Sequence, residues 1–352
     1  LTPLQSGEVV FEIYTYGSGC LRINGEEVKR FRNTHGGRSL DYTLQVKAGV
    51  PYDIELDFEY FRSDAQLNFD IGFKQKVNID ASVACVKDAD VVVFAGGISP
   101  LLEGEEMGVN LPGFRGGDRT DIELPAVQRE LIHALHRAGK KIILVNCSGS
   151  PIALEPETKN CEAILQAWYP GQAGGTAVAD VLFGDYNPGG RLPVTFYRNM
   201  SQLPDFEDYN MTGRTYRYMT QQPLFPFGYG LSYTTFEYGN LSLTKEQIKV
   251  GEPLKLTVNV TNNGQRDGEE VVQVYLKKQD DAEGPGKTLR AFKRVRIPAG
   301  KSVEVVFDLN GKELEWWDAQ SNTMRVCAGR YDVMVGKSSQ DRDLQRRSFV
   351  IE

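Results

Sequence analysis

The sequence has little cysteine, no long apolar run and no excess of positive charge, and each shortage excludes a class of protein. Its five cysteines are too few and too scattered for a disulfide framework, and their spacing fits no zinc site. We expect them to be buried thiols that act as small hydrophobic groups. No apolar stretch approaches the roughly 20 residues that a membrane helix needs. The net charge of −7 argues against a nucleic-acid-binding protein, which usually has a basic face.

An initiator methionine and a signal peptide are also absent. The chain starts at Leu1, within what reads as a β module, so we expect a fragment or a processed piece without its targeting signal. Hydrophobic residues make up 41% and charged residues 25%, which is typical of a globular protein. The 352 residues are enough for two or three domains.

Residues 1–80 have the pattern of antiparallel strands. Apolar side chains alternate with acidic ones from Tyr52 to Tyr60, which is the period of a half-buried strand. Asn24-Gly25 lies between two short strand-like runs and is a hairpin signal. We expect a partial β module, a small sandwich or barrel whose first strands are missing.

Residues 81–233 change to strands that alternate with helices, which is typical of a parallel α/β sandwich domain. Short apolar runs predict its buried strands, and apolar stripes of helical period predict its helices. The expected strands are 90–95, 141–145 and 163–168, and the expected helices are 81–89, 125–138 and 174–183. Residues 187–233 are rich in Pro, Gly and Tyr, and we expect an ordered connector because they are too aromatic to stay solvated.

Residues 234–352 return to short strands. Leu254, Leu256, Val258 and Val260 alternate with polar residues, and turn signals recur at intervals of roughly ten residues. This rhythm predicts an all-β sandwich. The expected fold is therefore multidomain, with an α/β domain over 81–233 flanked by β modules over 1–80 and 234–352.

A long loop follows the first expected α/β strand, at the edge where open α/β sheets bind ligands. It contains three carboxylates almost together, Glu103, Glu105 and Glu106, and then the pair Asp118-Arg119. In the simplest interpretation these are solvated surface charges and an ordinary surface ion pair. Alternatively one glutamate is a proton donor for glycoside cleavage, because crowding raises the pKa of at least one acid. Asp118-Arg119 would then pin the far end of the loop.

Other chemistry has weaker support in the sequence. His133 and His136 lie three residues apart on an expected helix, but no third metal ligand is near them in sequence. The chain has no Gly-x-Ser-x-Gly nucleophile elbow. For Trp316-Trp317, packing in a core or domain interface is favoured over a sugar platform. We therefore expect no metal and no cofactor.

Four stretches resemble glycoside hydrolase family 3. The first, Ile98–Glu106 with Gly116–Arg119, resembles the acid/base loop of that family. The second and third are Tyr169–Pro193 and Phe225–Tyr233. The fourth, Asn262–Gly264 with Gly268–Leu276, resembles the terminal fibronectin type III-like module of the family. The resemblance covers residues 81–352 nearly from end to end. Residues 1–80 resemble the second half of the protective-antigen-type insert that some members contain.

The resemblance implies a retaining mechanism with two separate contributors. The acid/base glutamate comes from the α/β loop, and matching Gly-Glu to the family pattern assigns it to Glu105. Glu103 and Glu106 are the alternates, because the loop before Asp118-Arg119 is longer than in many relatives. The Asp nucleophile comes from a preceding TIM-type barrel, which this sequence does not contain.

The predicted function is that of the C-terminal part of an exo-acting β-xylosidase or β-glucosidase, which hydrolyses terminal non-reducing β-linked sugars. Its expected partners are an oligosaccharide, such as one derived from a plant polysaccharide, and the missing barrel of the same protein. Alone the chain should be inactive. We expect a periplasmic or secreted location, with the cytoplasm as the alternative. The rival interpretation is a non-catalytic carbohydrate-binding or scaffold protein.

Overall fold

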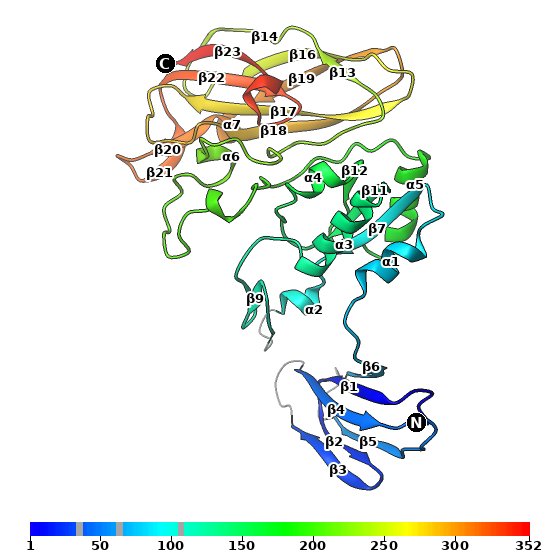
Figure 1. The fold of residues 1–352 in the computed structure, drawn as a ribbon. Coiled ribbons are helices and arrows are strands. Elements are labelled where there is room, and N and C mark those ends of the chain that lie inside the picture. Colours follow the sequence, from blue (N-terminus) through cyan, green and yellow to red (C-terminus); the bar gives the residue numbers. More distant parts are fainter. Residues whose placement is uncertain (33–37, 61–65, 105–108) are drawn as a thin grey trace. The chain divides into compact units, whose positions relative to one another are not determined.

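The structure is a computed structural model of the chain that describes all residues except 33–37, 61–65 and 105–108. Figure 1 shows the helices and strands in chain order. By its internal contacts the chain divides into two compact units. The first unit comprises Leu1–Gly149 and Asn160–Gln166. The second comprises Ser150–Lys159 and Ala167–Glu352.

The first unit begins with two three-stranded antiparallel sheets that share one core, which confirms the expected antiparallel β module. Asn24 and Gly25 both have positive φ, as a two-residue hairpin turn requires. Phe11 and Leu21, one from each sheet, are fully buried in the shared core. One sheet has the order β4 (Arg38–Val46), β1 (Gly7–Thr15), β6 (Leu67–Phe73), and the other β3 (Glu26–Phe31), β2 (Ser18–Ile23), β5 (Ile54–Glu59).

The α/β part of the first unit has a parallel sheet of three strands in the order β12-β11-β7, as expected. Its strands are β7 (Val91–Gly97), β11 (Lys141–Cys147) and β12 (Ala163–Gln166), and its helices are α1 (Ile79–Cys85), α2 (Pro100–Glu103) and α3 (Ala126–Arg137). Helix α3 buries Ile132 and Leu135, the apolar stripe that predicted it.

Two element boundaries in this part differ from the predictions. The first helix comprises Ile79–Cys85 and not residues 81–89. It begins at Ile79 because the side chain of Asn78 accepts a hydrogen bond from the amide of Ala81 (3.0 Å) and caps the helix. Strand β12 ends at Gln166 rather than Trp168, whose positive φ of 57° is incompatible with a strand. Neither feature was recognised in the sequence.

The second unit ends in a sandwich of two mainly antiparallel sheets, as expected for residues 234–352. Buried and exposed residues alternate along β16, which places Leu256 and Val258 in the core. One sheet contains β13 (Phe236–Tyr238), β14 (Ser242–Leu243), β16 (Leu254–Asn262) and β19 (Ser302–Leu309). The other contains β15 (Gln247–Ile248), β17 (Gly268–Lys278), β18 (Thr288–Ile297), β22 (Gly329–Gly336) and β23 (Leu344–Ile351).

Short elements complete the second unit. They are α4 (Glu157–Asn160, its last residue in the first unit), α5 (Gly174–Phe183), η1 (Met200–Gln202), α6 (Thr215–Tyr218), α7 (Gly311–Leu314), β20 (Glu315–Asp318), β21 (Thr323–Val326) and η2 (Asp341–Asp343). Helix α5 has the predicted bounds, and Gly184 caps its end in a left-handed conformation. Trp316 is buried in the sandwich core, which confirms the packing interpretation, whereas Trp317 is half exposed.

The connector 187–233 is bound to the sandwich by one buried ion pair and is held further by hydrogen bonds of Asn187. Arg191 Nη2 lies 2.9 Å from Glu270 Oε1 on β17, and these side chains are only 7% and 2% exposed. Asn187 donates to the carbonyl of Asp267 (2.9 Å) and accepts from the amide of Tyr233 (2.7 Å). The connector is therefore ordered, as predicted from its composition.

The cysteines depart from the expectation. All five thiols are free, but only Cys20 is buried, and Cys85 is exposed. Cys85 lies at the C-terminal end of α1, a helix that buries no residue among those described. Within the described residues, no helix has the length and apolar character needed to cross a membrane.

Candidate active-site loop

The loop begins at the carboxyl end of β7, and its first residues are held by two neighbouring elements. Gln128 of α3 accepts a hydrogen bond from the amide of Gly97 (2.8 Å) and donates one to its carbonyl (2.8 Å). The amide of Ile98 donates to the carbonyl of Cys147 on β11 (2.8 Å). A Cβ at Gly97 would lie only 1.8 Å from that carbonyl oxygen, so glycine is required there. The position from which the loop leaves the sheet is thus fixed.

The next turn is a short capped helix, α2. The hydroxyl of Ser99 accepts from the amide of Leu102 (3.2 Å), and Pro100 occupies the first helical position. Gly104 ends the helix with φ of 64°, and a Cβ there would lie 2.4 Å from Cγ2 of Val109. Both the backbone conformation and the close contact therefore require glycine directly before Glu105.

The structure places one of the three loop glutamates. Glu103 is the last residue of α2, and it is half-buried. Glu105 and Glu106 lie outside the described residues. The acid/base assignment to Glu105, with its two alternates, thus stays a prediction.

The far end of the loop forms a small antiparallel sheet that the sequence did not predict. Its strands are β8 (Asn110–Leu111), β9 (Phe114–Arg115) and β10 (Asp118–Arg119). Asp118 is opposite Arg115 in register and is exposed. The Arg119 guanidinium lies over the Phe114 ring (6.0 Å) and donates to the carbonyl of Glu123 (3.4 Å). An ion pair within Asp118-Arg119 stays a prediction.

A cavity of about 510 Å³ lies between this segment and the start of α3. Its charged lining is mainly acidic, with Asp121, Glu123 and Glu130. Glu123 is paired with Arg129 of α3 (2.5 Å), and the Asp121 carboxylate accepts from the amide of Glu123 (2.9 Å). These residues were not predicted from the sequence, although Asp favours a turn by accepting from the amide two positions on. Acidic side chains of the loop's far end and of α3 thus line this cavity.

A second polar group was also missed, at the carboxyl ends of β11 and β12. The side-chain amide of Asn146 donates to Oε1 of Gln166 (2.6 Å) and to the Ser148 hydroxyl (3.2 Å). Nε2 of Gln166 donates to the same hydroxyl (3.2 Å). Asn146 and Ser148 are fully buried. Ligands of open α/β sheets bind beyond this edge. Asn146, a polar residue inside the apolar run Lys141–Cys147, could have indicated this polar group in the sequence.

His133 also lines the cavity near α3. Among the residues described, no three His, Cys, Asp or Glu side chains are grouped so that they could hold a metal ion.

Comparison with known proteins assigns most of the chain to two family domains. Residues 15–233 match the glycosyl hydrolase family 3 C-terminal domain, and residues 270–339 match the fibronectin type III-like domain. A xylan 1,4-beta-xylosidase of Xylanibacter ruminicola is 49% identical over 99% of this chain and 40% of the relative. A periplasmic beta-glucosidase of Salmonella typhimurium is 38% identical over 74% of this chain and 34% of the relative.

Solved structures agree with these matches. A beta-glucosidase of Kluyveromyces marxianus has a TM-score of 0.79 at 27% identity, covering 100% of this chain and 43% of that one. A beta-glucosidase of Listeria innocua in complex with glucose has a TM-score of 0.65 at 28% identity, covering 80% of this chain and 39% of that one. This chain thus spans about 40% of the length of the xylosidase relative and aligns with a similar share of the solved enzymes. With a family domain that matches well over half of its residues, the chain belongs to glycosyl hydrolase family 3.

Proposed function

We propose that this chain is the C-terminal part of a retaining exo-β-glycosidase that removes terminal non-reducing β-linked sugars. The observation that carries the proposal is the match of residues 15–233 to the family domain, combined with the acid-rich sequence that follows the carboxyl end of β7. A β-xylosidase is favoured over a β-glucosidase because the relative that is 49% identical is named a xylosidase.

In this proposal Glu105 is the general acid/base. It first protonates the oxygen of the leaving group, and then takes a proton from the water that hydrolyses the glycosyl-enzyme intermediate. The described residues before the loop acid support the proposal. Gln128 holds both the amide and the carbonyl of Gly97, so the chain leaves the sheet at a defined point on its way to the proposed acid. Glu103 and Glu106 are the alternates.

The Asp nucleophile in this proposal comes from a barrel domain that precedes these residues in the whole protein. The chain covers only 40% and 34% of the lengths of two relatives, which is consistent with further domains in the whole protein. We extend the proposal to domain limits of 1–80, 81–233 and 234–352, and to a protective-antigen-type origin of the first module. The Kluyveromyces structure, which covers the entire chain, supports a common origin of that module. A periplasmic or secreted location is supported by the name of the Salmonella relative.

The test is a leaving-group series measured on the full-length enzyme. Replacing Glu105 with glutamine should slow turnover of aryl β-xylosides with poor leaving groups by about 10²–10⁴-fold, the usual contribution of general acid catalysis. Activated aryl glycosides need little protonation, so their glycosylation step should slow much less. Matched Glu103→Gln and Glu106→Gln variants serve as controls. An equal loss for all leaving groups would contradict the assignment to Glu105, and a graded loss in a control variant would transfer it there.

A second experiment tests whether the two catalytic carboxyl groups are divided between this chain and an upstream domain. The 352-residue chain alone should release no nitrophenol from aryl β-xyloside or β-glucoside, because double displacement needs both carboxyl groups. Turnover by the chain alone that depends on Glu105 would show that a nucleophile lies within these residues. Turnover that appears only when the upstream region is restored would support the proposal over a non-catalytic binding module.

A further inference from the structure

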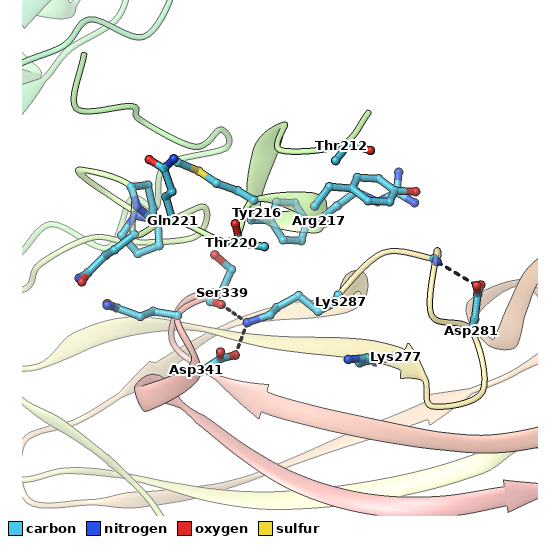
Figure 2. Close-up of a pocket in the computed structure, with 18 of the residues that line it drawn as sticks. Thr212, Tyr216, Arg217, Thr220, Gln221, Lys277, Asp281, Lys287, Ser339 and Asp341 are labelled. Carbon is cyan, nitrogen blue, oxygen red and sulfur yellow. Dashed lines mark hydrogen bonds and ion pairs between the residues drawn. The ribbon is translucent and has the colours of Figure 1, made fainter. Parts of the chain in front are cut away.

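The second unit has a cleft of about 1,020 Å³ that the proposed function does not use (Figure 2). Three segments far apart in sequence line it. They are residues 212–226 of the connector, residues 277–287 at the end of β17 and in the loop that follows, and residues 339–346 in the loop before β23 and at its start. Figure 2 shows Tyr216 and Arg217 on one side of the cleft and Lys277 and Lys287 on the other.

The walls of the cleft are bound to one another. The amide of Leu289 donates to the Tyr216 hydroxyl (3.1 Å), and the amide of Gly286 donates to the carbonyl of Arg217 (2.7 Å). The Tyr216 ring stacks on Phe227 with centroids 4.4 Å apart, and Phe227 in turn accepts from the amide of Ser339 (2.9 Å). Because these contacts connect all three segments, the cleft is preformed and needs little reorganisation to bind a ligand.

The cleft is positive although the chain is negative. Five cationic side chains line it against three acidic ones, Asp281, Glu283 and Asp341, a difference of two positive charges in a chain of net charge −7. The cations are Arg217, Lys277, Lys287, Arg342 and Arg346. A local field of this sign favours an anionic ligand.

Part of this positive charge is left without a counter-ion. Lys287 is paired with Asp341, and Arg346 lies 3.6 Å from Asp332. Arg217, Lys277 and Arg342 make no ion pair with any residue that the structure describes. Three cations of the cleft are thus available to a ligand.

Arg217 is the most unusual of the three. Its Nε is buried without a hydrogen-bond partner among the described residues, and its guanidinium carbon lies 5.6 Å from the Tyr218 ring. Burial lowers the pKa of the nearby Arg290, and the positive charge of Arg217 lowers it further. Two guanidinium groups close enough to repel each other are stabilised when an anion binds between or beside them.

The remaining lining fits a sugar better than a simple ion. Gln221, Gln222 and Gln340 supply amides, and Thr212 and Thr220 supply hydroxyls. Sugars present many hydroxyl groups that amides bind through paired donors and acceptors, whereas a small inorganic anion would not need so wide a lining. The volume of the cleft is also that of a site for a ligand of several rings.

We propose that this cleft binds a carboxylate-bearing oligosaccharide, with the uronate carboxylate on Arg217, Lys277 and Arg342 and the neutral sugars along the glutamine and threonine lining. The choice of a glycan rests on the proposed glycosidase function, whereas the preference for an anion rests on the charges of the cleft. Such a site would hold acidic polysaccharide fragments on the enzyme independently of bond cleavage.

The test measures binding and not activity. Calorimetric titration of the 352-residue chain with glucuronosyl-xylotriose should give saturable binding at low salt. Neutral xylotriose should bind at least about tenfold more weakly, because it lacks the charge-assisted hydrogen bonds. Binding should weaken as salt is raised. The Arg217→Met and Arg342→Met variants should each lose about tenfold in affinity, whereas Arg296→Met, which removes an exposed arginine of β18 outside the cleft, should bind normally.

Three results would overturn the proposal. Equal binding of xylotriose and glucuronosyl-xylotriose would show that no carboxylate is recognised. Acetate or sulfate binding as tightly as the acidic oligosaccharide would reduce the cleft to a general anion site. If Arg217→Met proves unfolded, Arg342→Met still tests the proposal, because Arg342 is exposed and its replacement should not disturb the fold. Unchanged affinity of Arg342→Met for the acidic oligosaccharide would also refute the proposal. Since catalysis is not measured, a failure here is distinct from failure of the Glu105→Gln series.

Discussion

Replacing Arg191 with methionine should destabilise the second unit strongly and in a pH-dependent way. The Arg191–Glu270 pair joins the connector to β17 at 2.9 Å, and both side chains are almost completely buried. Glu270 also accepts a hydrogen bond from the amide of Val271 (2.7 Å), which holds the carboxylate in place. Removing one partner of a buried pair leaves an uncompensated buried charge, which costs about 3–5 kcal/mol.

The pH dependence follows from the pKa of Glu270. Burial raises this pKa, and the Arg191 charge only partly opposes the rise, so the pKa should be higher still in the variant. The folded state then holds a proton that the unfolded state has released, and the stability of the variant relative to the wild type should increase as the pH falls from 7 towards 5. Below the pKa of Glu270 in the unfolded state, near 4.3, this benefit is complete.

Tryptophan fluorescence during urea unfolding is a suitable assay. All three tryptophans, Trp168, Trp316 and Trp317, belong to the second unit, so the signal reports on that unit alone. Arg296→Met is the matched control, because its ion pair with Asp267 is largely exposed and its loss should matter far less.

A double variant tests the same reasoning. Adding Glu270→Gln to Arg191→Met removes the buried charge, so the double variant should be more stable at pH 7 than Arg191→Met alone. The reasoning is refuted if Arg191→Met loses the same stability at pH 5 as at pH 7, or no more than Arg296→Met at neutral pH.

Two further predictions concern the first unit. Gln128→Leu removes both hydrogen bonds to Gly97 and should lower the free energy of unfolding by about 1–3 kcal/mol. Hydrogen exchange at the Gly97 amide should become faster, and less so in the control Gln128→Glu, which keeps the acceptor. Unchanged exchange would contradict the role of Gln128. Iodoacetamide at pH 8 should alkylate Cys85 well before Cys20, because Cys85 is exposed. The pKa of the Cys20 thiol is raised, first by burial and then by the neighbouring Asp57, which slows its reaction further. Equal alkylation rates by peptide mass spectrometry would disprove this order.

Local patterns in the sequence determined most of the secondary structure. Alternation placed β16, the helical stripe placed α3, and Asn24-Gly25 placed a hairpin, because each depends on neighbouring residues and on which face is buried. The same reasoning predicted that Glu103 follows a buried strand, whereas the catalytic assignment to Glu105 stays a prediction. The same reasoning failed where one side chain or dihedral decides a boundary, as with the Asn78 cap and the positive φ of Trp168.

Only the tertiary structure decided which distant residues meet. Arg191 and Glu270 are 79 positions apart, and Asn146 and Gln166 are 20 apart. Nothing local in the sequence selects such partners, since each contact depends on how whole elements pack. The cleft of the second unit is formed by three separate segments, so its positive charge is invisible in a chain whose net charge is −7. Sequence periodicity thus determines which face of an element is buried, whereas packing determines which polar groups are brought together at its edges.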